Sequence, residues 1–135
     1  MNKPNAWDRA KKLRLIRREP GALKGVPIDP GTNFFVAMLD QLRCPTYFSC
    51  EGHPKGFYIM FRATYLMATV LSKIGYFKYS IHGQEKWIMD TDDDAHERAV
   101  GKLTKVSRAK QMRYAADAWE KALGKLDFRS IKKEI

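Results

Sequence analysis

The sequence predicts an α+β fold, in which helices pack on a four-stranded, largely antiparallel sheet made of two hairpins. Aromatic and β-branched runs at 46–50 and 57–62 flank a polar loop that contains Gly and Pro, which is a hairpin pattern. A second such pair lies at 76–81 and 86–89, with Gly83 in the turn. Helical periodicity fills the segments between and after the hairpins, and this alternation is typical of an α+β layer.

A chain of 135 residues with 44% hydrophobic content is long enough for one domain with a real core. We expect a basic N-terminal arm at 1–25 and a single α+β domain at 26–135. No apolar run approaches the roughly 20 residues of a membrane span, and the N-terminus lacks the apolar stretch of a signal peptide. We therefore predict no membrane association and a cytoplasmic location, where Cys44 and Cys50 would stay reduced.

The net charge of +10 is unevenly distributed along the chain. Residues 1–25 carry eight Lys/Arg and two Asp/Glu, and residues 96–135 carry eleven and five. Residues 26–95 carry six Lys/Arg and eight Asp/Glu, so the middle of the chain is nearly neutral. Basic flanks attract polyanions through long-range electrostatics and counterion release, which favours nucleic acid or a nucleotide as a partner.

The N-terminal arm is expected to form a short helix on which Trp7, Ala10 and Leu13 recur at helical spacing. Pro20-Gly21 ends it, and residues 26–31 form an extended connector because each Pro disfavours helix in its predecessor. We expect the basic side chains of the arm to face outward, namely Arg9, Lys12, Arg14, Arg17 and Arg18.

Two further helices are predicted from apolar stripes. One bears Phe34, Phe35, Met38, Leu39 and Leu42. The other covers 64–74, and its inward face is expected to hold Leu66, Val70, Leu71 and Ile74.

Strand alternation places Thr46, Phe48 and Cys50 together on one face of the first hairpin. After the second hairpin, Thr91 and Asp94 form a capping-box pattern, so a long basic C-terminal helix is predicted from about residue 92. Its helical pattern runs to about Leu126 with a break near Gly101 or Ser107.

The loop of the first hairpin is the candidate site because it holds a thiol, a carboxylate and an imidazole within four residues. Cys50 and His53 are candidate catalytic groups, with Glu51 orienting the imidazole, since a nearby imidazolium activates a thiolate. Exposed strand aromatics beside Arg62 and Lys78 would offer a stacking platform for bases. The predicted ligand- and nucleic-acid-binding residues are Ser49, His53, Lys55, Tyr58, Arg62, Lys78, Lys102, Lys105, Arg108, Arg113, Arg14, Arg17 and Arg18.

We predict no bound metal. Cys44, Cys50 and His53 could contribute to a zinc site with His82 or His96, but the sequence has no Cys-x-x-Cys knuckle. The acidic cluster 90–94 is explained as a helix N-terminus, where carboxylates face the positive end of the dipole.

The stretch Thr46-x-x-Ser49-Cys50-Glu51-Gly52-His53, followed by Phe57-Tyr58-Ile59-x-Phe61, resembles uncharacterised bacterial and phage proteins with a Thr-x-x-Ser-Cys-Glu-Gly-His core. It is more distantly similar to the wybutosine-synthesis methyltransferase family, whose signature is Ser-Ser-Cys-Ser-Gly-Arg on a comparable strand. Ser49, Cys50 and Gly52 match that signature, whereas His53 stands where the family has Arg. The resemblance covers residues 32–62 and implies S-adenosylmethionine as a cofactor and tRNA as a substrate.

These observations predict a polyanion-binding protein that takes RNA or a nucleotide, attracted by the basic flanks and selected by the Ser49–His53 loop. We predict no cofactor for this binding function. One alternative is a nucleic-acid-modifying enzyme that uses Cys50 and His53, with S-adenosylmethionine as its cofactor. Another is a phage-type inhibitor or regulator that acts on a protein partner or a nucleotide signal. The sequence leaves the oligomeric state open.

Overall fold

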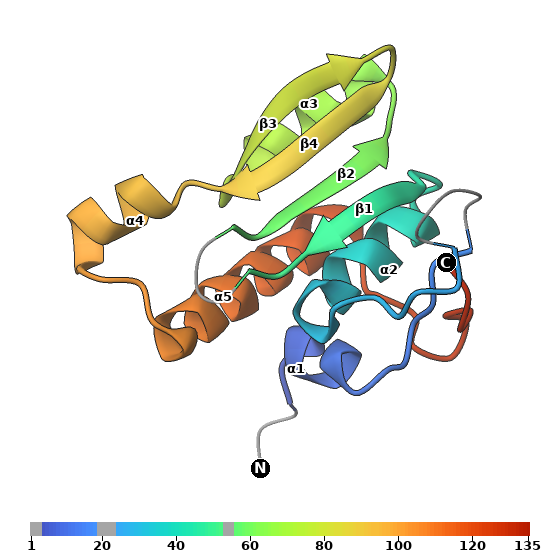
Figure 1. Cartoon of the computed structure of the whole chain (residues 1–135), viewed down its shortest axis with the longest axis horizontal. Coiled ribbons are helices and arrows are strands. Elements are labelled where there is room, and N and C mark those ends of the chain that lie inside the picture. Colours follow the sequence, from blue (N-terminus) through green and yellow to red (C-terminus); the bar gives the residue numbers. More distant parts are fainter. Residues whose placement is uncertain (1–3, 19–23, 53–55) are drawn as a thin grey trace.

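The computed structural model describes residues 4–18, 24–52 and 56–135. The chain order is helix α1, a 3-10 turn, helix α2, strands β1 and β2, helix α3, strands β3 and β4, and helices α4 and α5 (Figure 1). Their bounds are α1 Ala6–Lys11, 3-10 turn Pro30–Thr32, α2 Asn33–Gln41, β1 Thr46–Cys50, β2 Tyr58–Arg62, α3 Tyr65–Ile74, β3 Phe77–Gly83, β4 Lys86–Thr91, α4 Asp93–Val100 and α5 Lys105–Leu123.

The four strands form one antiparallel sheet in the order β1-β2-β4-β3, which confirms the predicted α+β class and the two hairpins. Helices α2, α3 and α5 lie behind this sheet in Figure 1, while the face toward the viewer bears no helix of the described chain. The sheet therefore has one covered face and one open face.

The covered face packs into an aromatic core. Phe35 of α2 lies at its centre and makes edge-to-face contacts with Phe57, Phe77 and Trp119, at centroid distances of 5.8, 5.1 and 5.0 Å. Such pairs contribute about 0.5–1.5 kcal/mol each beyond the burial of apolar area. These aromatic contacts join α2 to β3, to α5 and to the residue before β2. The covered face of the sheet is therefore fixed by core packing.

A β-bulge at Tyr47 changes the predicted faces of β1. Thr46 pairs with Phe61 and Phe48 pairs with Met60, so two residues of β1 oppose one step of β2. Thr46 is consequently buried on the core side, while Phe48 is 37% exposed. The expectation that these two side chains share a face is wrong, because the extra residue shifts the alternation by one position.

Helix α3 packs through part of the predicted stripe, since Leu71 and Ile74 face the core as expected. Ala68 and Leu71 are buried, and Met67 and Ile74 pack against the core from the same side of the helix. Leu66 and Val70 are 74% and 41% exposed, so their predicted inward orientation is wrong. The helix has apolar residues on two sides, and periodicity alone could not decide which side meets the sheet.

The C-terminal helical region consists of two helices that separate at Gly101, where φ is +95°. Asp92, rather than the predicted Thr91, caps α4 by accepting a hydrogen bond from the Ala95 N–H at 3.1 Å. A Thr104–Ser107 capping box then starts α5, so the break falls between two capped helices.

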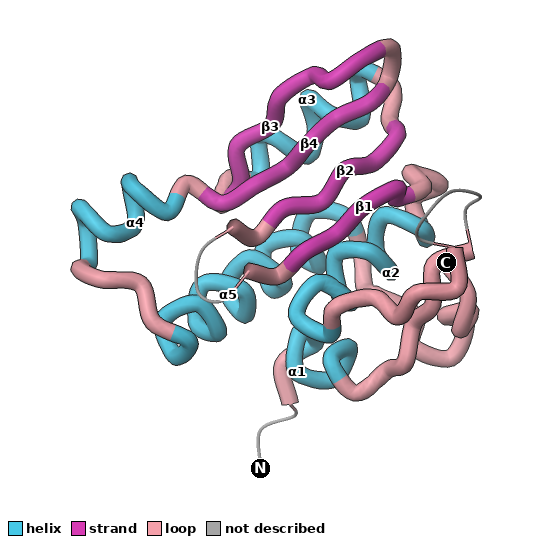
Figure 2. Tube along the Cα trace, in the orientation of Figure 1, coloured by secondary structure: helices cyan, strands magenta, loops and turns pink. Residues whose placement is uncertain are grey.

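The described part of the N-terminal region packs on the body of the protein. Trp7 of α1 is 4% exposed, and α1 packs against α2 and α5. The chain after α5 returns to the same region, where Ile135 N–H donates to the Ile16 carbonyl at 2.8 Å (Figure 2). Among the described residues, no helix combines the length and apolar character needed to cross a membrane.

Candidate functional site

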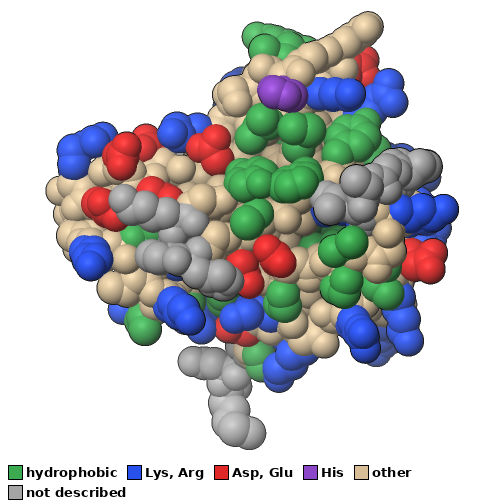
Figure 3. Space-filling model, in the orientation of Figure 1, with side chains coloured by type: hydrophobic (Ala, Val, Ile, Leu, Met, Phe, Trp, Pro, Cys, Tyr) green, Lys and Arg blue, Asp and Glu red, His purple; other side chains and the backbone are tan. Residues whose placement is uncertain are grey.

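The open face of the sheet carries a stacked aromatic pair. Phe48 of β1 and Tyr58 of β2 lie with their ring centroids 5.5 Å apart and their planes only 10° from parallel. The bulge at Tyr47 turns Phe48 to this side, and the register opposite Cys50 brings Tyr58 beside it. Met60 and Ile88, which pair across β2 and β4, continue this apolar surface. Hydrophobic side chains gather at the centre of this face in Figure 3.

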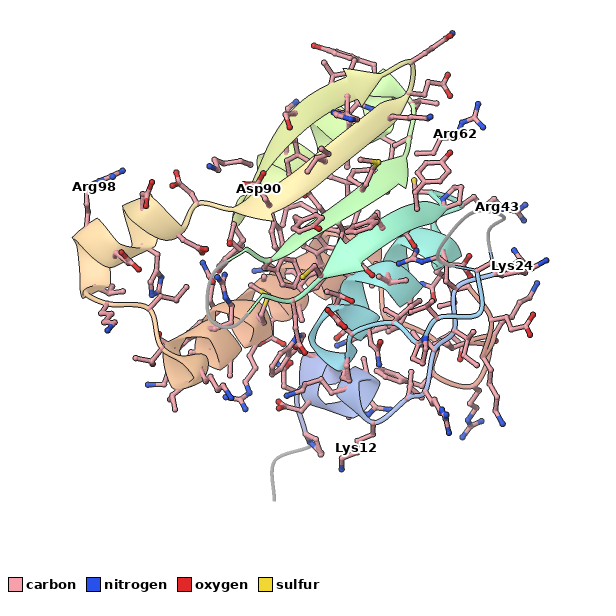
Figure 4. The ribbon with its side chains drawn as sticks, in the orientation of Figure 1. Lys12, Lys24, Arg43, Arg62, Asp90 and Arg98 are labelled. Carbon is pink, nitrogen blue, oxygen red and sulfur yellow. The ribbon has the colours of Figure 1, made fainter. Side chains whose placement is uncertain are left out.

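One end of the open face is basic. Arg62 and Lys86 pair across β2 and β4, and the Lys86 ammonium lies 5.7 Å from the centre of the Tyr47 ring. Arg43 and Lys24 lie at the same side of the molecule as Arg62 (Figure 4). The exposed Arg62 is 3.8 Å from Glu85, a contact that solvent screens strongly.

The opposite end of the open face has mixed charge. Lys78 lies 3.5 Å from Asp90, and the register places both on the same row as Tyr58. Of the predicted cations on the strands, Arg62 and Lys78 therefore both lie on the open face beside the aromatic pair.

A cavity of about 200 Å³ lies next to the aromatic pair. Burial raises the pKa of Tyr58, and the charges of Cys50 and Asp29 raise it further, so its phenol stays protonated and can donate a hydrogen bond. Residues from four parts of the chain line this space, namely Arg17, Val26, Pro27, Ile28, Asp29, Phe48, Ser49, Cys50 and Tyr58.

Arg17 lines this cavity and also holds strand β1 in place. It is 4% exposed and donates to the Thr46 carbonyl at 2.8 Å, to Thr46 Oγ1, and to Ser49 Oγ at 2.7 Å. The prediction that Arg17 faces outward is wrong. Strand β1 is an edge of the sheet, so its unpaired acceptors need donors, and a guanidinium offers five.

The segment Ser49–Gly52 lies between two cavities. Ser49 and Cys50 line the one beside the aromatic pair, while Glu51 and Gly52 line another of about 380 Å³ between α1 and α5. The Glu51 N–H donates to the Asp29 carboxylate at 3.2 Å, which fixes the path of this segment. His53 and Lys55 lie outside the described residues, so the pairing of Cys50 with His53 stays a prediction.

Apart from Arg17, the predicted cations of the two basic flanks are either paired with a carboxylate or exposed to solvent. Arg108 is buried and lies 2.8 Å from Asp93, whose side chain is 13% exposed, and Arg113 lies 2.8 Å from Asp8 of α1. Hydrogen bonding to Asp8 raises the pKa of Arg113. The other predicted cations of the two flanks are exposed, namely Arg14, Arg18, Lys102 and Lys105.

Asp93 joins three segments of the chain. It accepts hydrogen bonds from the Arg108 guanidinium, the Thr91 hydroxyl and the Gly56 N–H. Burial opposes its ionisation, but these hydrogen bonds and the charge of Arg108 outweigh burial and hold the pKa of Asp93 below its ordinary value. The Asp93–Arg108 pair therefore fastens the start of α4 to α5 beside the exit of the first hairpin loop.

Sequence reasoning missed Phe48 and Lys86 on the open face, and Arg43 and Lys24 at the same side of the molecule as Arg62. Lys86 lies beside Arg62 because β2 pairs with β4. Hairpin patterns predict pairing only between consecutive strands, so they could not predict this pair. Strand alternation placed Phe48 on the same face as Thr46, and only the bulge in β1 turns it to the open face.

Among the described residues, no group of three or more His, Cys, Asp or Glu side chains could hold a metal ion. Cys44 is buried, and burial raises the pKa of its thiol. Comparison with protein-family models, with curated proteins and with solved structures found no match to this chain. The resemblance to the methyltransferase signature stays a prediction, and the functional argument rests on the geometry.

Proposed function

We propose that this protein binds single-stranded RNA across the open face of its sheet. The observation that carries the proposal is the parallel Phe48–Tyr58 pair on an antiparallel sheet face that no described helix covers. Unpaired bases stack on aromatic side chains, and a four-stranded sheet with aromatics on its open face is a known platform for this. Tyr47, which lies beside Lys86, adds a third ring near the same surface.

The charge around the platform supports a polyanionic ligand. Arg62 and Lys86 stand at one end of the stack and can contact phosphates, with Arg43 and Lys24 beyond them (Figure 4). The basic flanks add a long-range field that raises the local concentration of RNA. The cavity beside the stack, lined by Asp29, gives the edge of a stacked base a polar partner.

Two polar side chains favour RNA over DNA. Ser80 pairs with Ile88 in the same row of the sheet as Phe48 and Met60, and His82 follows two residues later on the same exposed strand. Both can hydrogen-bond a ribose 2′-hydroxyl, which is the group that distinguishes the two nucleic acids.

The test is the affinity for a fluorescent RNA of about 10 nucleotides, within the site size typical of such platforms, measured by anisotropy. Because a base–aromatic stack contributes about 1–3 kcal/mol, Phe48→Ala should weaken binding about 5- to 150-fold. Tyr65→Ala is the matched control, since Tyr65 is a 75% exposed aromatic on α3, behind the sheet. Equal losses in both variants, or no loss in either, would contradict the proposal.

A second arm of the experiment separates binding from catalysis. Lys86→Gln should lower the affinity and reduce the slope of log K against log salt by about 0.7 for one lost phosphate contact. Cys50→Ser should leave RNA affinity unchanged. If Cys50→Ser instead abolished a covalent change in the RNA without altering its affinity, the modifying-enzyme alternative would replace simple binding.

A further inference from the structure

We propose that two copies of this chain associate through the outer edge of β3, which extends the sheet from four strands to eight. Strand β3 is last in the order β1-β2-β4-β3, and no described segment pairs with its outer side. The backbone N–H and C=O groups along that side are therefore left without a strand partner. The inference does not depend on the proposed function, because the backbone edge and the covered side of β3 are not part of the aromatic platform.

The other edge of the sheet, strand β1, is protected by the chain itself. Arg17 donates a hydrogen bond to the Thr46 carbonyl at 2.8 Å, so one backbone acceptor of this edge is already satisfied. The bulge at Tyr47 also interrupts the regular pairing of the strand. Side-chain charges and bulges are common devices against edge-to-edge pairing.

Strand β3 lacks comparable protection. It contains no Pro, and its pairing with β4 is regular from Phe77 to Ile81. Lys78 is its single Lys or Arg, and the ammonium lies 3.5 Å from the carboxylate of Asp90 on the neighbouring strand. The outer side of β3 is therefore a regular edge that can accept another strand.

Exposed apolar side chains flank this edge. Ile81 is 64% exposed, although Phe77, which points to the same face of β3, is 8% exposed. Ile81 pairs with Trp87, and Tyr65 of α3 lies against Trp87 with ring centroids 5.9 Å apart. Tyr65 is 75% exposed, and Tyr76 at the other end of β3 is 45% exposed. Helix α3 lies behind β3 and β4 in Figure 1, so the covered layer ends at this edge with apolar side chains in solvent.

A second copy of the chain fits this edge better than an extended peptide. Antiparallel pairing of β3 with its own copy places a two-fold axis perpendicular to the sheet, so both copies of α3 lie on the same side. Because side chains alternate with a period of two, an axis near the middle of β3 sets Ile81 opposite Phe77 or Tyr79 of the second copy. A lone peptide brings no covering layer and leaves Tyr65 exposed.

The charge of the edge permits this pairing. Each copy carries a net charge of +10, which opposes association over most of the surface. Residues 74–84 contain one charged side chain, Lys78, and Asp90 offsets its charge. Two copies of this edge therefore meet with little repulsion.

The area available reaches that of the smallest specific interfaces. Tyr65 and Tyr76 together expose roughly 200–300 Å², since a whole aromatic side chain presents about 150–250 Å². Strand β3 has seven residues, so its edge is about 23 Å long at about 3.3 Å per residue. Pairing of this edge and burial of Ile81 bring the area to roughly 500 Å² per copy. The total of about 1,000 Å² is the lower limit for a biological interface.

Sedimentation equilibrium of the full chain without RNA tests the association. Over roughly 1–300 µM, the range expected for an interface of minimal size, the average mass should rise from 15.6 kDa toward twice that value. A mass that stays at 15.6 kDa throughout would overturn the proposal. Because no RNA is present, this failure would leave the proposed RNA binding untouched.

Two variants and one further measurement locate the interface. Ile81→Lys places a charge in the paired edge and should weaken association at least tenfold, whereas Val106→Lys, at a 69% exposed residue of α5, should leave it unchanged. Association that survives Ile81→Lys, or that both variants weaken equally, would overturn the proposal. Should Ile81→Lys not fold by circular dichroism, amide exchange of the unaltered chain decides: exchange along β3 should slow at high concentration, and slowing confined to other elements would overturn the proposal.

Discussion

Replacing Arg17 by Met should destabilise the protein, although the sequence presents Arg17 as one of several surface cations. Its guanidinium donates three hydrogen bonds to Thr46 and Ser49, and Thr46 is 1% exposed. Each buried acceptor that loses its donor costs about 1–3 kcal/mol. Met fills part of the volume of the Arg17 side chain without placing a charge in the interior. Ser49 is only half-buried, so water can replace its lost donor and the main cost arises at Thr46. We therefore expect the free energy of unfolding to fall by about 2–4 kcal/mol, a large share of the roughly 5–15 kcal/mol of a typical domain.

Urea unfolding followed by tryptophan fluorescence measures this change, because Trp7 and Trp119 are buried. Arg18→Met is the matched control: it makes the same charge change at the next residue, whose side chain is exposed, and should shift the free energy of unfolding by less than about 0.5 kcal/mol. Equal stabilities of the two variants would refute the structural role given to Arg17. Arg17→Met should also loosen Ser49 and Cys50, seen as faster amide exchange along β1.

Two further predictions concern residues around the same site. Asp93→Asn should lower the free energy of unfolding by about 2–4 kcal/mol at pH 7, because the lowered pKa of Asp93 means that its carboxylate stabilises the fold above its ordinary pKa of 3.8. This effect is lost as the pH falls through the lower folded value, so the difference from wild type should vanish in urea unfolding near pH 2. The half-exposed Asp90→Asn should change the stability little at any pH. Gly31→Ala should lower the free energy of unfolding by about 1 kcal/mol, because the Glu51 side chain must move away from the new methyl group. In a Glu51→Ala background the same change should cost clearly less, and additive losses would contradict the contact.

Both hairpins were predictable because each consists of two short aromatic and β-branched segments that flank one turn, all close together in the sequence. Gly83, whose φ of +148° few other residues adopt, marks the second turn, and the first loop follows an aromatic strand. The class of the sheet followed from their alternation with helices. The pairing of β2 with β4, which brings Arg62 beside Lys86, depends instead on tertiary packing that no local pattern encodes.

The rest of the site depends on effects that operate over long sequence distances. Nothing near Arg17 indicates that Thr46, 29 residues away, needs its guanidinium. Leu66 and Val70 satisfy helical periodicity with Leu71 as well as Met67 and Ala68 do, and only the position of the sheet decides which of them are buried. The orientation of Phe48, on which the platform depends, follows from a single extra residue in β1.

The two basic flanks, which the sequence presents as separate segments on either side of a neutral module, form a common surface. Helix α1 packs on α5, where Arg113 contacts Asp8 and its guanidinium lies 5.6 Å from the centre of the Trp7 ring. Lys11 and Lys105 both line the adjoining cavity. The positive field of both flanks therefore converges beside the Ser49–Gly52 segment, which also borders the aromatic platform. If the protein binds a polyanion as proposed, this field would raise the rate of encounter beside the sheet, and stacking on the sheet would then retain the ligand.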